Sequence, residues 1–204
     1  MSRTEGLEWL AALRGDALLL EIATVTDRAM RGEIPLQNVY AARLDAVRPT
    51  RAEVADLGRE YVRTLAHGAH GSVKTLRAAG VRVVIVSGGL RDAVIPLARS
   101  LGVPDADVHA VGLSFTEAGE YAGFDTASPL ARTGGKPVLV RSLDLPAPIL
   151  AVGDGITDAE IRMAVPPAAD AFVAFTGVTA RAAVLRVADY SIELFSQLLP
   201  IVLP

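Results

Sequence analysis

Two aspartates stand where a parallel sheet would bind a ligand. The turn Gly153-Asp154-Gly155-Ile156-Thr157-Asp158 follows the apolar run 149–152 and precedes a helix-like segment, 159–164. In open α/β sheets, ligands bind beyond the carboxyl ends of the strands, so Asp154 and Asp158 would face one ligand. Neighbouring carboxylates repel each other, and a hard cation such as Mg²⁺ relieves this repulsion while also accepting phosphate oxygens. The turn therefore predicts a metal-dependent phosphate site. An Asx turn with a helix N-cap is the alternative, and it explains one aspartate more easily than two.

A second turn with phosphate-binding character follows the apolar, β-branched run 81–86, which predicts a strand buried on both faces. Ser87, Gly88 and Gly89 end this strand and lead into a helix-like segment. Backbone N–H groups at a helix start bind anions, and a serine hydroxyl adds a further donor. A serine N-cap with glycines for a tight turn is the simpler alternative, and the turn taken alone favours it.

Lys136 follows Gly134-Gly135 and could neutralise a phosphate from a flexible loop. The segment is not a Walker A loop, because Leu130 stands where that motif needs glycine. The turn at 153–158 likewise departs from a dinucleotide fingerprint, since its sixth position is Asp158. A solvated surface lysine is the alternative for Lys136.

The elements that must position these residues fall into two blocks. Periodic leucines predict helices from about residue 4 to residue 66, with Pro35 opening a third helix and Thr50 opening a fourth through a capping box with Glu53. Strands and helices then alternate, which predicts a parallel sheet covered on both faces. We therefore expect a helical cap over residues 1–66 and an α/β core over residues 67–204, with a β-hairpin flap near residues 111–124.

Composition limits the classes of protein to consider. The 204 residues are about half hydrophobic, contain no cysteine and carry a net charge of −3. No apolar run reaches membrane-spanning length, and the first residues lack the apolar stretch of a secretory signal. We expect a cytoplasmic protein with no membrane or nucleic-acid partner.

Three residues of the helical block gain interest only in combination. The guanidinium of Arg43 could grip a carboxylate, whereas the residue types alone suggest no binding role for Glu5 or Met30. Each has a simple alternative: a solvated helix face for Arg43, a capping box from Ser2 to Glu5, and interior packing for Met30.

Taken together, these segments resemble the phosphoserine phosphatase family of the haloacid dehalogenase superfamily over nearly the whole chain. The matching segments, in chain order, are Glu5-Gly6, Ala29-Met30-Arg31-Gly32, Arg43, Val86-Ser87-Gly88-Gly89, Glu120-Tyr121-Ala122-Gly123-Phe124, Gly134-Gly135-Lys136, Gly153 to Asp158 and Ala169-Asp170-Ala171-Phe172. Two loops depart from the family pattern: Thr176-Gly177-Val178 replaces Gly-Gly-Asn, and His67 replaces a proline.

The resemblance implies a Rossmann-like α/β core with a parallel sheet and a four-helix cap. It also implies catalytic roles for Ser87, Lys136 and Asp158, with Ser87, Gly88 and Lys136 holding the phosphoryl group. Mg²⁺ would be bound by Asp154 and Asp158. The substrate would be held by Glu5, Arg43, Met30 and Thr157.

The serious departure concerns the catalytic motif of the family, Asp-x-Asp-Ser-Thr, which is absent from the 204-residue sequence. Counting back from Glu5 places the motif, and the first core strand that bears it, before Met1. We therefore expect a misassigned start, in which a Val or Leu codon is read as the initiator. Without a nucleophile, covalent phosphoryl transfer has no first step.

The reaction that the resemblance implies is Mg²⁺-dependent hydrolysis of O-phospho-L-serine to L-serine and phosphate through an aspartyl phosphate, in L-serine biosynthesis. A phosphatase or phosphotransferase for another small phosphorylated amino acid is one alternative. A catalytically inactive homologue that binds ligands or regulates is the other. The sequence does not give the oligomeric state.

Overall fold

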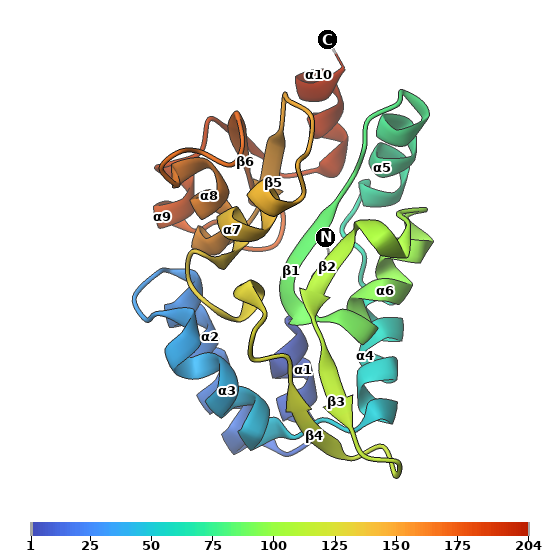
Figure 1. The fold of residues 1–204 in the computed structure, drawn as a ribbon, viewed down its shortest axis with the longest axis vertical. Helices are drawn as coiled ribbons and strands as arrows, with labels where there is room; N and C mark the ends of the chain where they lie inside the picture. The colour runs from blue at the N-terminus through green and yellow to red at the C-terminus, as the bar shows by residue number, and fades with distance from the viewer. Residues whose placement is uncertain (1, 204) are drawn as a thin grey trace.

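The computed structural model describes residues 2–203, and its amino-terminal block is helical (Figure 1). The helices of this block are α1 (Gly6–Ala12), α2 (Asp16–Met30), α3 (Leu36–Val47) and α4 (Arg51–Arg63). The capping box predicted at Thr50 is present: the Thr50 hydroxyl accepts the Glu53 N–H at 3.2 Å, and the Glu53 carboxylate accepts the Thr50 N–H at 2.8 Å. These bonds pair amide groups that the first helical turn leaves free.

The rest of the described chain alternates between strands and helices, as predicted. Its longer elements are α5 (Ala69–Ala78), β1 (Ile85–Leu90), α6 (Arg91–Ser100), β2 (Val108–Val111), β3 (Leu113–Phe115), β4 (Tyr121–Phe124), α7 (Gly135–Ser142), β5 (Leu150–Gly153), α8 (Ile156–Met163) and β6 (Ala171–Phe175). The shorter ones are η1 (Asp105–Asp107), η2 (Pro129–Ala131), α9 (Ala182–Leu185), β7 (Tyr190–Ile192), η3 (Phe195–Leu198) and α10 (Leu199–Val202).

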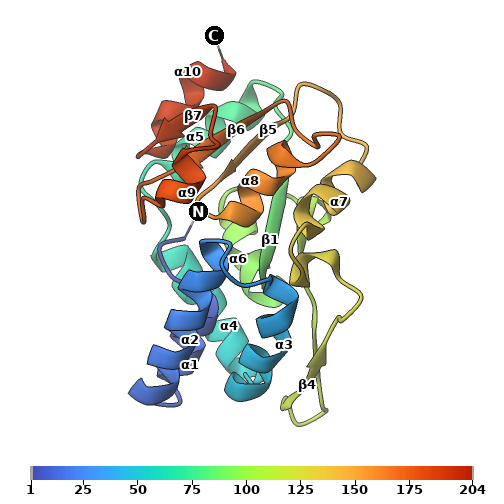
Figure 2. The ribbon, with the colours of Figure 1, turned by 90° about the vertical axis from the view of Figure 1, so that its left-hand side faces the viewer.

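The strands of the α/β part form two separate parallel ladders within residues 2–203. One joins β1 to β2, and the other has the order β5-β6-β7. Helices α7 to α9 lie on one side of the molecule and α4 to α6 on the other (Figures 1 and 2). In the described part of the chain, no strand joins β1 to β5. Strands β3 and β4 form an antiparallel hairpin within the segment predicted as a flap.

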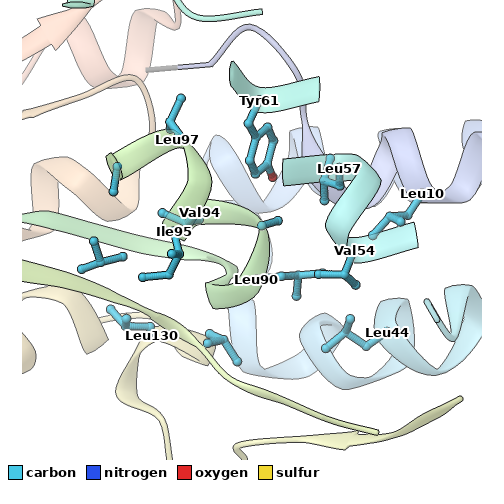
Figure 3. Packing of buried hydrophobic residues seen from close by; sticks show 14 of the residues in the cluster. Leu10, Leu44, Val54, Leu57, Tyr61, Leu90, Val94, Ile95, Leu97 and Leu130 are labelled. Atoms are coloured by element: carbon cyan, nitrogen blue, oxygen red, sulfur yellow. The ribbon is translucent and has the colours of Figure 1, made fainter. Parts of the chain in front are cut away.

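One apolar core joins the helical block to the first ladder. Helix α4 packs against α6 so closely that a Cβ on Gly58 would lie 3.0 Å from the Pro96 ring. Leu10, Leu44 and Leu57 are fully buried in the same cluster as Leu90 and Val94 (Figure 3). Since the cluster crosses residue 66, the division into a cap over 1–66 and a core over 67–204 stays a proposal. No described helix is both long enough and apolar enough to cross a membrane.

Three local predictions were wrong. The strand predicted over 81–86 begins at Ile85 and continues through Ser87, Gly88 and Gly89, because β2 pairs with residues 85–90 and nothing described pairs with 81–84. The capping box proposed from Ser2 to Glu5 does not form, since α1 begins at Gly6 and Ser2 instead bridges to Leu65. Pro35 precedes α3 rather than opening it.

Candidate active site

A cavity of about 320 Å³ lies where the helical block meets the whole length of β1 and the carboxyl end of β5. Its lining includes every residue that the sequence proposed for the site: Glu5, Met30, Arg43, Ser87, Gly88, Lys136, Asp154, Thr157 and Asp158. The two strands bring the serine turn and the aspartate turn together, while α2 and α3 supply the residues of the helical block.

Asp158 is held by two donors. Lys136 Nζ lies 2.6 Å from Asp158 Oδ1, and the Gly155 N–H donates to Oδ2 at 3.0 Å. Both side chains of the ion pair are largely buried, with 13% and 15% exposed. A Cβ at Gly153 would overlap the Asp158 carboxyl carbon, so glycine is needed there to seat the carboxylate.

Lys136 lies in the first turn of α7 and not on the flexible loop that the sequence suggested, and the loop that leads into this helix is anchored at two points. The Gly134 N–H donates to Glu160 Oε2 at 2.8 Å, and Glu160 lies on α8, the helix that also carries Asp158. A Cβ at Gly135 would overlap the Pro129 carbonyl oxygen, so the loop passes directly over η2. Burial raises the pKa of Glu160. The close approach to Pro129 explains Gly135, and a φ of 74° explains Gly134. Together these features fix where the Lys136 ammonium group can reach.

Asp154 is paired with an arginine that the sequence analysis did not identify. Arg181 Nη1 lies 2.6 Å from Asp154 Oδ2 and 3.1 Å from the Asp154 carbonyl oxygen. The Arg181 side chain is 10% exposed and that of Asp154 is 38% exposed. Asp154 therefore presents a carboxylate at the edge of the cavity, with a guanidinium on one of its oxygens.

Ser87, Gly88 and Gly89, which we continue to call the serine turn, lie where the pairing of β1 with β2 is interrupted between Val86 and Leu90, and hydrogen bonds order them. The Gly89 N–H donates to Ser87 Oγ at 3.0 Å, and the Gly88 carbonyl accepts the Tyr40 hydroxyl at 2.8 Å. A Cβ at Gly88 would lie 3.3 Å from the Leu130 carbonyl oxygen, so the turn also passes close to η2. Tyr40 is 3% exposed, and burial raises the pKa of its hydroxyl, which stays protonated and donates.

Three charged side chains of the helical block, Glu5, Glu8 and Arg43, also line the cavity. Arg43 is 7% exposed; its Nη1 donates to Thr26 at 2.9 Å, and its buried Nε has no hydrogen-bond partner among the described residues. Burial lowers the pKa of Arg43. Burial also raises the pKa of Glu5 and Glu8, and the charge on Asp154 adds to the effect at Glu5. The cavity lining therefore combines a buried guanidinium with two carboxylates, which are the groups needed to bind the carboxylate and the ammonium group of a zwitterionic ligand.

The helical block closes directly onto the aspartate turn. A Cβ at Gly155 would lie 3.0 Å from Met30 Sδ. At the start of α3, the Leu36 N–H donates to Thr133 Oγ1 at 2.8 Å, and Gln37 Oε1 accepts the Thr133 N–H at 3.1 Å. The helices therefore cover the cavity from above the turn, an arrangement that keeps bulk water from a bound ligand.

The donor set around Asp154 and Asp158 fits Mg²⁺. Mg²⁺ binds through one or two carboxylates and completes its shell with water and phosphate oxygens. Residues 2–203 contain no cluster of three or more acidic, histidine or cysteine side chains that could hold a metal alone. Asp154 is the better placed of the two, because both oxygens of Asp158 already accept hydrogen bonds.

Sequence reasoning missed Tyr40, Glu8, Glu160 and Arg181, all of which lie in or beside the site. Tyr40 precedes Arg43 by one helical turn, a spacing that signals a shared helix face. Glu8 has the same spacing from Glu5, whereas Glu160 lies only two residues after Asp158 and no helical spacing links the two. Arg181 lies on a loop, where no periodicity could have marked it.

Known proteins resemble this chain over most of its length. The sequence profile of the haloacid dehalogenase-like hydrolases matches residues 4–161. The human phosphoserine phosphatase is 37% identical over 202 residues, which cover 97% of this chain and 86% of that protein. The chloroplastic phosphoserine phosphatase of Arabidopsis thaliana is 36% identical over 198 residues, 96% of this chain and 66% of that protein.

Solved structures show the same fold. A phosphoserine phosphohydrolase-like protein from Francisella tularensis superposes with a TM-score of 0.90 at 23% identity, covering 99% of this chain and 94% of that one. A substrate-bound phosphoserine phosphatase complex superposes with a TM-score of 0.79 at 21% identity, covering 98% and 91%. The chain therefore belongs to the haloacid dehalogenase-like hydrolase family, and its relatives identify it as a phosphoric monoester hydrolase among the phosphoserine phosphatases.

Proposed function

We propose that this site binds O-phospho-L-serine and serves its Mg²⁺-dependent hydrolysis to L-serine and phosphate, as part of serine biosynthesis. The observation that carries the proposal is that the lining of one cavity combines phosphate-binding groups with a buried arginine and two glutamates. Phosphoserine has complementary ends: a phosphate ester, and an amino group beside a carboxylate.

Three groups would bind the phosphate: the Ser87 hydroxyl, the Gly88 N–H and the Lys136 ammonium. Ser87 Oγ has accepted the Gly89 N–H, so its own O–H is free to donate to a phosphoryl oxygen. The Gly88 N–H supplies a second donor, and the Lys136 ammonium supplies positive charge. Asp158 keeps the ammonium at a fixed point, which avoids reorganisation when the ligand enters.

At the amino-acid end, Arg43 binds the substrate carboxylate and Glu5 binds the ammonium. The buried Nε of Arg43 is the donor that a carboxylate would satisfy. A bound ammonium would in turn stabilise the ionised form of Glu5, which burial disfavours. Met30 and Thr157 close the wall between the two ends.

Mg²⁺ belongs to this proposal as the cofactor. Asp154 would be its carboxylate ligand, and Asp158 would hold the lysine and the bound waters. When bound, the ion would neutralise charge that builds on the phosphoryl oxygens.

The chemical step needs a nucleophile, and the 204-residue sequence has no Asp-x-Asp-Ser-Thr motif. We propose that an aspartate encoded upstream of Met1 attacks phosphorus. The ester P–O bond would break, the serine oxygen would take a proton from a second aspartate, and water would then hydrolyse the acyl phosphate. A cytoplasmic location stays a prediction.

The test compares the 204-residue chain with a chain extended by the upstream codons in the same reading frame. We expect both to bind phosphoserine with Mg²⁺, and only the extended chain to release phosphate. Rates on phosphoserine, phosphothreonine, phosphohomoserine and a sugar phosphate would define the substrate class.

Three outcomes would contradict the proposal. Binding without turnover in the extended chain would favour a binding or regulatory protein. Preference for another phosphorylated amino acid would correct the substrate, and preference for the sugar phosphate would refute the roles of Glu5 and Arg43.

A further inference from the structure

Tyr40 links the helical block to the serine turn. It lies on α3, is 3% exposed, and its hydroxyl donates to the Gly88 carbonyl at 2.8 Å. Its ring packs against Phe124 of the β3–β4 hairpin, with ring centroids 5.3 Å apart, and the Arg43 guanidinium lies 5.8 Å from its ring centroid. One side chain therefore contacts the serine turn, the hairpin and the arginine proposed to bind the substrate carboxylate.

The hydrogen bond from Tyr40 acts on a peptide unit that also controls Ser87. The Gly88 carbonyl and the Gly89 N–H belong to the same peptide group. Tyr40 binds the carbonyl, and the N–H donates to Ser87 Oγ at 3.0 Å. A peptide between two glycines rotates with little steric restraint, so hydrogen bonds at its two ends must set its orientation.

This chain of contacts prepares Ser87 to bind an anion. An accepted hydrogen bond at a carbonyl strengthens the N–H of the same peptide as a donor. That N–H occupies a lone pair of Ser87 Oγ and leaves the hydroxyl proton to point elsewhere. Rotation of the peptide would release Ser87 Oγ and would also turn the neighbouring amides of the turn.

Resting on the function proposed above, we propose that Tyr40 is a positioning residue for phosphoryl binding. Its hydroxyl fixes the Gly88–Gly89 peptide, and that peptide fixes Ser87 Oγ. Because Tyr40 and Arg43 share one face of α3, the helix that brings the arginine to the substrate carboxylate also orders the serine turn. A shift of α3 away from the cavity would undo both contacts together.

The test uses the 204-residue chain with inorganic phosphate and Mg²⁺, so it does not depend on turnover. Tyr40→Phe keeps the ring, its packing on Phe124 and its volume, and removes one hydroxyl. Tyr121→Phe is the matched control, because Tyr121 is also buried, at 5% exposed, and does not line the cavity. Calorimetry gives phosphate affinity, and thermal unfolding shows whether each variant stays folded.

We expect Tyr40→Phe to weaken phosphate binding roughly 3- to 10-fold, the range that one hydrogen bond supports, with Tyr121→Phe unchanged. Combining Tyr40→Phe with Ser87→Ala tests whether Tyr40 acts through Ser87. If Tyr40 acts through Ser87, Tyr40→Phe loses little further affinity in the Ser87→Ala background, whereas independent effects would multiply.

Unchanged phosphate affinity in Tyr40→Phe would overturn this inference alone, as would multiplied losses in the double variant or an equal loss in Tyr121→Phe. Failure of the unmodified chain to bind phosphate would overturn it together with the proposed function. Normal phosphate binding without hydrolysis in the extended chain would leave Tyr40 in its role and refute only the enzymatic proposal.

Discussion

Arg181 grips Asp154 at two points, with Nη1 2.6 Å from the carboxylate oxygen Oδ2 and 3.1 Å from the main-chain carbonyl oxygen of the same residue. The guanidinium is nearly buried, and its Nε has no partner in the described part of the chain. In this arrangement Arg181 occupies Oδ2 of Asp154 and leaves Oδ1 for Mg²⁺, because Oδ1 accepts no hydrogen bond from a described residue. The guanidinium and the ion would then share one carboxylate, and their positive charges would repel each other.

Replacement of Arg181 should strengthen Mg²⁺ binding. Arg181→Gln removes a positive charge beside the ion, and we expect Mg²⁺ affinity to rise several-fold. Calorimetric titration with Mg²⁺ measures it, and Arg186→Gln, at an exposed position five residues along the chain, is the control. Weaker Mg²⁺ binding would mean that Arg181 orients Asp154 for the ion instead of repelling it.

Substitution of Gly153 should disrupt the Lys136–Asp158 pair. A Cβ at this position overlaps the Asp158 side chain, whose two oxygens are both hydrogen-bonded. We expect Gly153→Ala to lower the free energy of unfolding by about 1–3 kcal/mol, the usual cost of overpacking, and to weaken phosphate binding. Denaturant unfolding and phosphate titration measure the two effects.

The control is Gly71→Ala. Gly71 lies inside α5 with open space around its Cβ direction, so alanine should raise stability by about 0.5–1 kcal/mol. Wild-type stability in Gly153→Ala would show that Asp158 moves aside without cost.

Glu5 should make the stability of the chain depend on pH. Burial, with a further contribution from Asp154, raises the pKa of Glu5 above its ordinary value of 4.5. The folded state then binds a proton more tightly than the unfolded state. The contribution of Glu5 to the free energy of unfolding is fully present below pH 4.5. It is lost as the pH rises through the raised pKa, because the buried carboxylate becomes charged.

Glu5→Gln removes that titration without removing a hydrogen bond to a described residue. We expect the variant to be more stable than wild type at pH 7, by about 1.4 kcal/mol for each unit by which the pKa is raised, and equal to it near pH 4. Unfolding curves across that range test the sign, with the exposed Glu21→Gln as control. A variant that is less stable at pH 7 would refute the assignment of a buried, unfavourable charge.

Local signals predicted most of the elements, because helix caps and hydrophobic periodicity act within a few residues. The capping box at Thr50 formed as predicted, and the apolar run before Asp154 became β5. The start of β1 was predicted wrongly because strand limits depend on a partner. Strand β2 reaches only as far as Ile85, a fact that the run 81–86 does not contain.

The residues of the candidate site also fall into two groups, those that a local pattern predicts and those that depend on tertiary contacts. Ser87, Lys136 and the two aspartates of the turn at 153–158 lie in glycine-rich segments, and these glycines indicate tight backbone turns from the sequence alone. Tyr40 and Arg181 gained their places through tertiary contacts with partners 48 and 27 residues away. Such contacts depend on how α3 and the loop after β6 pack. The spacing of Tyr40 from Arg43 signals only a shared helix face and does not indicate the contact with Gly88, and no local pattern marks Arg181.

Arg43 should separate recognition of the amino acid from recognition of phosphate. Its guanidinium is buried, donates to Thr26 and keeps an unpaired Nε at the cavity. Lysine keeps the charge but loses the fork that grips a carboxylate at two points. We therefore expect Arg43→Lys to weaken phosphoserine binding about tenfold, the loss typical of one charge-assisted hydrogen bond, and to leave inorganic phosphate binding within about twofold.

The two ligands can be compared by calorimetry on one protein preparation, with Arg28→Lys as a control on the exposed surface of α2. Equal losses for phosphoserine and phosphate would place Arg43 at the phosphate end. No loss for either ligand would show that Arg43 does not contact the substrate. A ligand without a carboxylate would then be the better candidate. Within residues 2–203, no other buried guanidinium both lines the cavity and has an unpaired nitrogen that could bind the carboxylate in place of Arg43.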